Sequence, residues 1–304
     1  MLRQPQPLRT CFKCGVVEHI ASNTALWPPN WQCKACGFSP AIREGFVQLS
    51  PDLDDVDEGF ALTSFENLRS MEDGHFWFAT RNEMIKWLVS RYATKASRVL
   101  EIGCGTGFVL FALREMLPTA KIAGSELHSA GLRHARSRHG HDIELIQMDA
   151  RRSGLSNVFD LVGAFDVLEH IRDDEGVLKE IYSMLRPSGI LIATVPQHPW
   201  LWSDVDAMAH HQRRYAIGEL SAKAKAAGFR IRYHSSFASL SLPLLALNRW
   251  RAKRSMTAAT SESVMPSSVN DVLTKLFQLE HVLRRARIPL PLGGSGVLVA
   301  EKLT

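Results

Sequence analysis

A glycine-rich turn is the first group of residues whose spacing could hold a small polar ligand. The segment from Glu101 to Gly107, EIGCGTG, follows an apolar strand-like run and precedes a helical one. Glycines at this point, Gly103, Gly105 and Gly107, permit a tight turn that a ligand can approach, and a helix N-terminus offers amides. The GxGxG spacing differs from the GxGxxG of dinucleotide folds, so the loop need not cradle a pyrophosphate. It favours a nucleoside that carries an amino-acid tail.

Two carboxylates stand where the next strands are expected to end. Glu126 lies nineteen residues after Gly107, where a carboxylate can accept hydrogen bonds from both hydroxyls of a ribose. Asp149 ends the third strand, in a position to receive the amino group of an adenine. The plainer alternatives are a solvated strand-end carboxylate for Glu126 and a helix cap for Asp149. The neighbouring glycine turn favours the ligand interpretation.

Four of the five cysteines form two CxxC pairs, Cys11 with Cys14 and Cys33 with Cys36. Eighteen residues separate the pairs, and a glycine follows each one, as in zinc knuckles whose backbone amides point at thiolates. In a reducing compartment such pairs indicate a metal rather than disulfides. A structural Zn²⁺ would supply the folding energy of a module too short to build its own core.

A second chemical cluster follows the fifth expected strand, between residues 200 and 215. Ligands of open α/β sheets bind outside the carboxyl ends of the strands, and this cluster would lie there. Its indoles, imidazoles, phenol and guanidinium groups suit a sugar, a quinol or a phosphorylated molecule. Alternatively, the two arginines pair with Asp204 and Asp206 and close a loop. The side chains expected to bind a substrate are Trp202, Arg213, Arg214 and Tyr215.

A scaffold must position these residues. The sequence alternates strand-like and helical runs, and this alternation is typical of βαβ units that form a parallel sheet. A helical pattern over 65–92 leads into this alternation. Strands are expected at 98–103, 121–126, 142–148, 159–166, 189–196, 230–236 and 296–303. Helices are expected at about 107–117, 128–139, 173–186 and 217–229. The predicted fold class is therefore α/β.

The chain of 304 residues favours one main domain and a small module. We expect a zinc ribbon at 1–49, an acidic linker at 50–64 and the main domain at 65–304. The main domain carries an insertion at about 237–294, with an apolar stretch that ends in basic residues, a Ser/Thr-rich piece and an amphipathic helix. An insertion of this length is usually functional or disordered.

The formal charge of +5 permits an anionic partner without demanding one. The N-terminus lacks the apolar run of a secretory signal, and no segment has the roughly 18 apolar residues of a membrane span, so a cytoplasmic protein is expected. Residues 240–254 could contact the inner face of a membrane peripherally, and their alternative is a lid helix or core.

Several motifs in register resemble those of class I S-adenosylmethionine (SAM)-dependent methyltransferases, in the branch with ubiquinone and menaquinone biosynthesis enzymes. They are LEIGCGTG, GSELH, QMDA, AFDVLEHI and LRPSGILIATVP, within about residues 98–236. The resemblance implies a Rossmann-like sheet of seven strands, the last one antiparallel, with helices on both faces. It also implies SAM as the cofactor, bound by Glu101, Gly103, Gly105, Gly107, Glu126, Asp149, Ala150 and Asp166.

Within that resemblance the glycines flank the methionine part of SAM, Glu126 binds the ribose, and Asp149 with Ala150 binds the adenine. Asp166, at the end of the fourth strand, faces both cofactor and substrate. The segment HFWF before Arg81 resembles a helix that covers the cofactor in related enzymes, where Arg81 would meet the methionine carboxylate. Core packing is the alternative for its aromatic residues.

Methyl transfer displaces an activated sulfonium in line, so the protein mainly excludes water and positions the reactants. A hydroxyl acceptor would also need a base, for which His170 and His211 are the candidates beside Asp166. His170 could instead merely cap or pack its loop.

Two acceptor classes follow from these features. The first is a small molecule or a lipid- or saccharide-linked metabolite. The second is RNA, because the ribbon resembles the zinc module ahead of certain ribosomal RNA guanine methyltransferases. Between Cys11 and residue 49 only Lys13, Lys34 and Arg43 are basic, so we favour the metabolite. A SAM-binding regulator without catalysis would require a blocked site.

Overall fold

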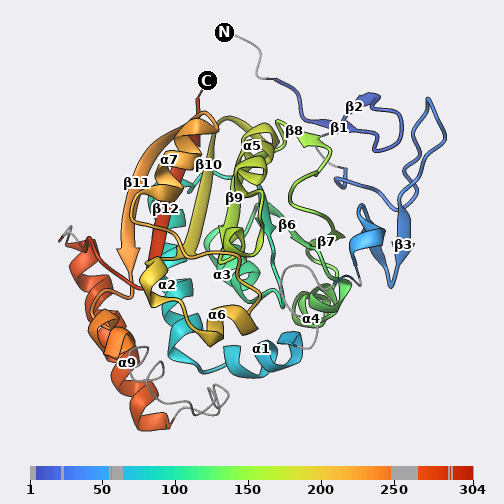
Figure 1. The fold of residues 1–304 in the computed structure, drawn as a ribbon. Helices are drawn as coiled ribbons and strands as arrows, with labels where there is room; N and C mark the ends of the chain where they lie inside the picture. Colours follow the sequence, from blue (N-terminus) through green and yellow to red (C-terminus); the bar gives the residue numbers. More distant parts are fainter. Residues whose placement is uncertain are drawn as a thin grey trace.

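The computed structural model describes residues 5–21, 24–54, 56, 64–247, 266–286, 288 and 290–303. Its centre is a nine-stranded sheet with the order β11-β12-β10-β9-β5-β6-β7-β4-β3 (Figure 1). Five strands that run parallel to one another form its middle: β5 (Arg98–Ile102), β6 (Lys121–Glu126), β7 (Glu144–Gln147), β9 (Phe159–Phe165) and β10 (Leu185–Pro196). Each is a short, mostly buried run, as expected of parallel strands covered on both faces.

The last strand reverses direction, as expected from the resemblance. β12 (Ser295–Lys302) inserts antiparallel between β10 and β11 (Phe229–Phe237). All seven expected strands are confirmed, with end points that differ by a few residues at most. The predicted α/β fold with a mostly parallel sheet is therefore confirmed.

Helices cover both faces of the sheet and enclose two apolar cores. One core contains residues from α5 (Asp174–Met184) and α7 (Glu219–Ala226). The other contains residues from α2 (Phe76–Tyr92), α3 (Phe108–Met116) and α4 (Ser129–His139). The helices expected around 107–117, 128–139, 173–186 and 217–229 correspond to α3, α4, α5 and α7.

The helical pattern expected over 65–92 is interrupted. α1 (Ser64–Glu72) ends before Gly74, which adopts a φ of +113° that side chains disfavour. α2 then starts afresh, with Nδ1 of His75 accepting a hydrogen bond from the backbone N–H of Trp77. The Asp-Gly pair at 73–74 was the sequence signal for this break.

The N-terminal module joins the main sheet instead of standing apart. β3 (Ala41–Arg43) and β4 (Phe46–Gln48) form a hairpin, and β4 pairs with β7 in parallel. Beside them, β1 (Leu8–Thr10) pairs with β2 (Val17–His19) and with β8 (Leu155–Ser156) of the main domain. The domain boundary expected at residue 49 therefore comes after two strands, β3 and β4, that belong to the main sheet. These strands form one edge of that sheet.

The segment expected as a linker, 50–64, begins with ordered contacts. Pro51–Leu53 form a short 3-10 turn, and the buried carboxylate of Asp54 accepts hydrogen bonds from the backbone N–H and the hydroxyl of Ser129. Residues 55 and 57–63 lie outside the described part of the chain.

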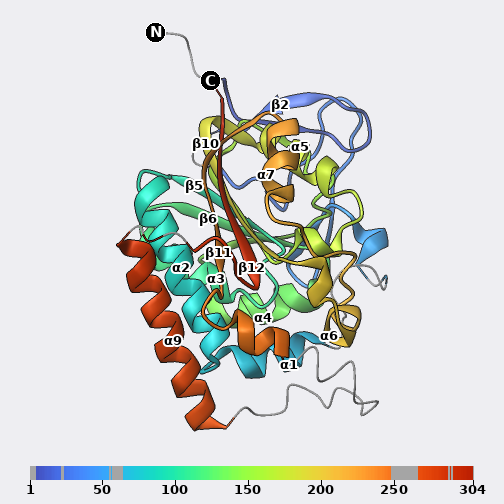
Figure 2. The ribbon, with the colours of Figure 1, turned by 60° about the vertical axis from the view of Figure 1, so that its left-hand side comes forward.

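The insertion expected at 237–294 contributes a long helix, α9 (Ser267–Arg285), which lies along α2 (Figure 2). Phe277 is the residue of α9 buried in the core with α2. Of the segment expected to contact a membrane, 240–254, residues 248–254 lie outside the described part of the chain, as do residues 255–265. Among the described helices, none has the length and apolar character needed to cross a bilayer.

Candidate active site

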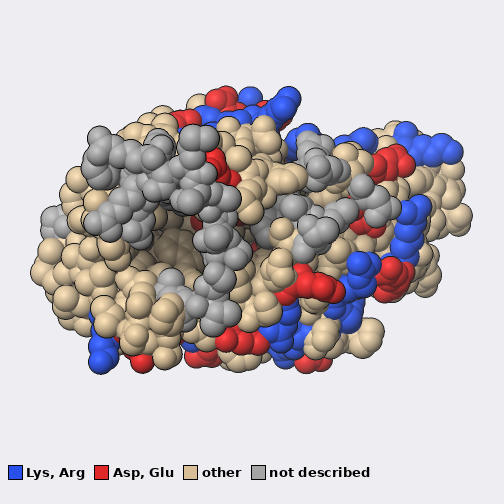
Figure 3. Space-filling view, turned by 60° about the horizontal axis from the view of Figure 1, so that its bottom comes forward, with Lys and Arg blue, Asp and Glu red and all other residues tan. Residues whose placement is uncertain are grey.

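A cavity of about 890 Å³ opens at the carboxyl ends of the parallel strands. Figure 3 shows this face hollowed, with residues other than Lys, Arg, Asp and Glu along one side of the hollow. The part over β5, β6 and β7 is called the acidic half and is lined by Glu72, Glu101, Gly103, Gly105, Glu126 and Asp149. The part over β9 and β10 is called the histidine half and is lined by Asp166, Glu169, His170, His211 and Arg214.

The glycine turn connects β5 to α3 and forms the floor of the acidic half. Gly103, Gly105 and Gly107 all have positive φ angles, of 64°, 50° and 79°. A Cβ atom on Gly103 would lie 2.4 Å from Cγ2 of Val167, so this position also lacks the space for a side chain. Gly107 precedes α3 and does not line the cavity.

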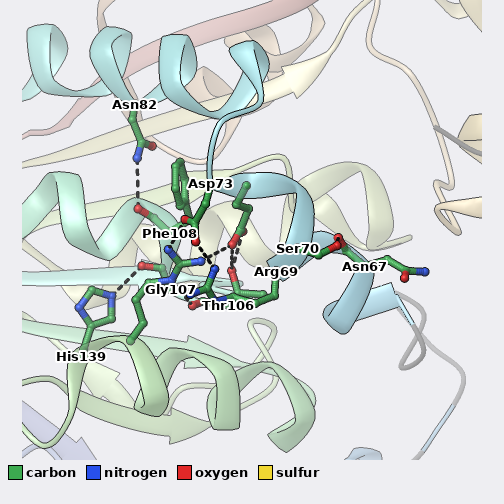
Figure 4. A network of polar contacts seen from close by, with 11 residues as sticks. Asn67, Arg69, Ser70, Asp73, Asn82, Thr106, Gly107, Phe108 and His139 are labelled. Atoms are coloured by element: carbon green, nitrogen blue, oxygen red, sulfur yellow. Dashed lines mark hydrogen bonds and ion pairs between the residues drawn. The ribbon is translucent and has the colours of Figure 1, made fainter. Parts of the chain in front are cut away.

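Polar contacts from three helices brace this turn (Figure 4). The hydroxyl of Thr106 lies 2.5 and 2.6 Å from the carboxylate oxygens of Glu72, which also binds the Arg138 guanidinium at 2.6 Å. Nε2 of His139 lies 2.7 Å from the carbonyl oxygen of Gly107. Asn82 donates a hydrogen bond to the carbonyl of Phe108. Sequence reasoning missed Glu72, which the helical pattern around it presents as an ordinary surface acid.

Glu126 ends β6 and faces the turn across the cavity. One of its carboxylate oxygens accepts a hydrogen bond from the backbone N–H of Gly105 at 3.0 Å, and the other accepts one from Leu127. Burial raises the pKa of Glu126, and the imidazole of His128 and these amides oppose the rise. A carboxylate oxygen has more than one acceptor site, so the same group can also receive ligand hydroxyls.

Asp149 and Ala150 follow β7 and line the far end of the acidic half. The Asp149 carboxylate caps its own loop by accepting from the backbone N–H of Arg151, and it forms an ion pair with the Arg151 side chain at 2.9 Å. The capping alternative is thus observed, and it is compatible with a position on the cavity wall.

Glu101 is the most deeply buried acid of the acidic half, with only 2% of its surface exposed. Its Oε2 atom has no hydrogen-bond partner among the described residues. Burial raises the pKa of Glu101 well above its usual value, against the partly compensating charge of Arg81. A buried carboxylate without a strong partner is costly unless a ligand cation reaches it. The acidic half is therefore suited to a ligand that carries positive charge.

Asp166 sits between the two halves, at the end of β9. It has a φ of 56°, which a residue other than glycine rarely adopts. Its carboxylate accepts from the Arg81 guanidinium at 2.6 Å and from the Thr194 hydroxyl at 2.9 Å. Arg81 thus lines the cavity and is paired with Asp166, while its expected contact with the methionine carboxylate stays a prediction. Strain of this kind is concentrated at functional sites.

Two imidazoles and a carboxylate meet in the histidine half. The rings of His170 and His211 are perpendicular, with centroids 4.8 Å apart, and Glu169 lies beside them. Burial lowers the pKa of His170 to about 3, with a smaller contribution from His211, so His170 is neutral near pH 7. Nδ1 of His211 lies 3.0 Å from the Asp206 carboxylate in α6 (Asp204–Met208). Sequence reasoning named both histidines and missed Glu169, although it stands within the LEHI motif.

Of the four residues expected to bind substrate, only Arg214 lines the cavity. Arg214 lines the cavity and pairs with Asp206 at 2.7 Å, so the loop-closing alternative holds for this arginine. Arg213 instead pairs with Asp174 at 2.9 Å, not with Asp204, and does not reach the cavity wall. Tyr215 is fully buried and donates its hydroxyl hydrogen bond to Asp174 as well. Trp202 follows the 3-10 turn Pro199–Leu201 and lies outside the wall.

An apolar wall completes the histidine half. α2 supplies Phe76 and Trp77, whose rings pack edge to face with Phe277 of α9, and the Trp77 ring also packs at a tilt against Phe237 of β11. The cavity is also lined by Ser241, Leu244 and Leu245, and by Leu273 of α9. The sequence left open whether the aromatic residues of HFWF cover the ligand site or pack in the core. In the structure Phe76 and Trp77 pack against the core and also line the cavity.

The four cysteines of the N-terminal module meet at one point, and none of them lines the cavity. The Sγ atoms of Cys11 and Cys36 are 3.6 Å apart, and so are those of Cys14 and Cys33. Four sulfurs at about 2.3 Å from a tetrahedral zinc would be separated by about 3.8 Å. The two turns are alike, because Gly15 and Gly37 donate to the carbonyls of Cys11 and Cys33. This cluster could bind zinc.

Comparison with known proteins agrees with the fold and the motifs. Residues 99–189 match the family model described as a methyltransferase domain. A Mycolicibacterium smegmatis protein named "Probable S-adenosylmethionine-dependent methyltransferase" is 26% identical over 179 residues, 56% of this chain and 65% of that protein. A ubiquinone biosynthesis O-methyltransferase of Pseudomonas entomophila is 27% identical over 121 residues, 38% of this chain and 51% of that protein. The chain thus spans about half to two thirds of these curated relatives.

Solved structures share the fold at low identity. One is a chain of the Haloferax volcanii complex between the Trm112 methyltransferase activator and a methyltransferase. It has a TM-score of 0.57, 17% identity and coverage of 82% of this chain and 100% of that chain. A Thermotoga maritima SAM-dependent methyltransferase has a TM-score of 0.51, 17% identity and coverage of 79% and 96%. The family match over residues 99–189 and the curated relatives support a SAM-dependent methyltransferase domain, and the sheet order agrees with that fold.

Proposed function

We propose that this protein transfers the methyl group of SAM to a small-molecule or a lipid- or saccharide-linked acceptor. The observation that carries this proposal is one continuous cavity with two chemically different halves. Its volume lies at the upper end of the roughly 300–1,000 Å³ typical of drug-sized ligands. The cavity therefore has room for a cofactor in the acidic half and part of an acceptor in the histidine half.

SAM fits the charge of the acidic half, because its sulfonium and ammonium groups are both positive. In the proposed arrangement Gly103 and Gly105 flank the methionine part, and Glu101 faces its ammonium group. Glu126 binds the ribose hydroxyls, while Asp149 and Ala150 hold the adenine. Bound SAM supplies an activated methyl group, and the chain positions it and excludes water.

The histidine half supplies a base if the acceptor is a hydroxyl. His211 is held by Asp206 through Nδ1, which leaves Nε2 to accept a proton. His170 is neutral near pH 7 because burial lowers its pKa to about 3, but this low basicity makes it the weaker base. We therefore assign the proton transfer to His211 and keep Asp166 as a group that orders Arg81 beside the cofactor.

The apolar wall favours an acceptor with a hydrocarbon part. Leu244 lines the cavity and is 48% exposed, Leu247 is 40% exposed, and α9 exposes Val272 and Val282 by 65% and 61%. Exposed apolar side chains of this kind suit a lipid-borne acceptor and peripheral contact with a membrane.

The ribbon gives RNA little support as the acceptor. None of the described residues before Phe65 lines the cavity. The ribbon instead docks on the main domain, where Glu144 accepts hydrogen bonds from the backbone of Leu26 and Trp27. We propose that its four cysteines bind one structural Zn²⁺ that stabilises this edge of the sheet.

Calorimetric titration with S-adenosylhomocysteine tests the cofactor site. We expect micromolar binding that Gly105→Arg abolishes, because a side chain at this open position would enter the cavity. Gly218→Arg is the matched control, since Gly218 also has positive φ and open space but lies outside the cavity. Failure of the folded wild-type protein to bind would overturn the proposal.

The acceptor class is tested with SAM labelled in its methyl group. Purified protein is incubated separately with a lipid extract, an aqueous metabolite extract and total RNA. Label in either of the first two fractions supports the proposal, and label in RNA alone replaces it. Metal analysis of protein purified without chelator should find about one zinc per chain. Zinc that persists unchanged in Cys33→Ser would contradict the four-cysteine site.

A further inference from the structure

A carboxylate and two imidazoles in the histidine half are arranged as metal ligands. Glu169 and His170 lie on the 3-10 turn Leu168–His170 that follows β9, and His211 lies after α6. One ligand atom from each of the three lies within 4.8 Å of the others. Ligands at about 2.1 Å from an ion at right angles would be about 3.0 Å apart, so modest side-chain rotation closes the site.

Glu169 independently points to a missing positive charge. It is 1% exposed, and its Oε2 atom has no hydrogen-bond partner among the described residues. The two guanidinium groups nearby are already engaged, Arg81 with Asp166 and Arg214 with Asp206. A buried charged carboxylate without a charge partner destabilises the folded protein. A bound cation removes that penalty.

The surroundings of His211 also resemble those of a metal-binding histidine. Such a histidine usually donates its second ring N–H to a carboxylate, which fixes the tautomer and the ring orientation. Asp206 takes this role at Nδ1, and its position is in turn fixed by Arg214 at 2.7 Å and by Ser203 at 2.9 Å. Nε2 of His211 is then the ligand atom.

We propose that Glu169, His170 and His211 bind one divalent first-row metal ion at the acceptor end of the cavity. Two imidazoles and one carboxylate on one side of an ion leave its other positions open to a ligand from the cavity. The site is distinct from the cysteine cluster, whose thiolates select softer ions. Its role in catalysis rests on the proposed methyl transfer, whereas metal binding itself does not.

The ion would change how an acceptor hydroxyl is activated. A hydroxyl oxygen bound to a divalent ion has a lowered pKa and loses its proton to solvent. The oxygen then forms a bond to the methyl carbon as the bond from that carbon to sulfur breaks. The products are a methyl ether, S-adenosylhomocysteine and the released proton. In this case His211 acts as a ligand and not as the base.

Titration with Mn²⁺ tests the site, followed by the electron paramagnetic resonance signal of the free ion. The protein is used whole, with zinc left in the ribbon, since a hard ion does not displace zinc from thiolates. We expect about one Mn²⁺ per chain, and at least about tenfold weaker binding in His211→Ala and in Glu169→Gln. Glu169→Gln keeps the shape of the side chain and removes its buried charge, so the variant should fold.

His210→Asn is the matched control, because His210 is the sequence neighbour outside the ligand set and asparagine tolerates its φ of 57°. Binding of S-adenosylhomocysteine is measured on every variant. No Mn²⁺ binding in protein that binds S-adenosylhomocysteine would overturn the metal site and leave the proposed function intact. Equal Mn²⁺ binding in all four proteins would also overturn it. Mn²⁺ binding without S-adenosylhomocysteine binding would uphold the site and overturn the proposed function.

Discussion

The acidic half of the cavity takes its polar groups from the ends of neighbouring parallel strands, whereas the histidine half takes its groups from separate loops and helices. Glu101, Glu126 and Asp149 each stand at the end of a strand, in the order of the chain. His211 comes forty-one residues after His170, and the apolar wall comes from α2, α9, Leu244 and Leu245.

The two halves also differ in how their charges are balanced. Glu101 and Glu126 are carboxylates whose pKa values are raised by burial. In the histidine half Asp206 and Asp166 are each paired with an arginine, and only Glu169 lacks such a partner among the described residues. This difference agrees with the proposed function, in which the acidic half binds one cationic ligand and a second ligand enters the ordered network of the histidine half. The halves should therefore respond separately to substitution.

The largest expected effect is on turnover, from His211→Ala in the histidine half. Loss of a proton acceptor typically slows a reaction by roughly 10²- to 10⁴-fold, and loss of a metal ligand acts in the same direction. The affinity for S-adenosylhomocysteine should stay unchanged, because His211 lies over β10 and not over β5 or β6. Rates are measured with labelled SAM and affinity by calorimetry. Parallel losses of rate and affinity would show that the halves are one unit.

Gly103→Ala should damage the acidic half instead. The new Cβ atom would lie 2.4 Å from Cγ2 of Val167, and such overpacking costs about 1–3 kcal/mol, or roughly 5- to 150-fold in affinity if the turn shifts. Calorimetry with S-adenosylhomocysteine measures the loss.

Gly218→Ala is the control for backbone strain alone. Its φ of +80° resembles that of Gly103, but a Cβ atom there meets nothing within 4 Å. We expect it to lose about 1–2 kcal/mol of stability without losing affinity. Equal affinity losses in both variants would mean that the contact with Val167 is irrelevant.

Glu101→Gln should weaken S-adenosylhomocysteine binding by roughly 10- to 100-fold, because a hydrogen bond to a charged group contributes about 1.5–3 kcal/mol. The ligand-free protein should be no less stable, since the substitution removes a buried charge without a strong partner. Calorimetry and thermal unfolding together check both parts. Glu83→Gln, at an exposed position of α2, provides the control. A variant that loses stability but keeps its affinity would make Glu101 a purely structural acid.

The smallest expected effect is the pH dependence of cofactor binding. The raised pKa values of Glu101 and Glu126 mean that the ligand-free protein holds these protons to a higher pH than usual. A ligand ammonium group favours the ionised carboxylates, so binding must expel protons and affinity should fall as the pH falls through the raised values. The fall is at most about tenfold per pH unit for each proton. Calorimetry across pH should show a shallower slope in Glu101→Gln, and an equal slope would remove Glu101 from the linkage.

The sequence predicted the parallel strands, the helices between them and the glycine turn, because each of these depends on residues within a short segment of the chain. Buried parallel strands are short apolar runs, and a turn with positive φ needs glycine. Strand-end carboxylates follow from the same pattern, since parallel strands that share a direction bring their ends to one edge. The cysteine pairs are also local, and their meeting in space agrees with the spacing.

Other features depend on contacts that no local pattern contains. The break between α1 and α2 had a signal in Gly74, but the length of the helical pattern concealed it. The pairing of β4 with β7 joins residues about a hundred positions apart, and Arg213 and Arg214 are neighbours that bind different carboxylates. Sequence alone did not show that Tyr215 would point into the core.

The sequence by itself determined the α/β alternation, the acidic strand ends and the glycine turn, because these depend on side-chain period and backbone conformation within a few residues. The tertiary structure alone decided that Glu169, His170 and His211 meet, and that α9 closes an apolar wall beside them. Such convergence depends on how loops pack after the sheet has formed, and the energy of that packing is shared among residues far apart in the chain.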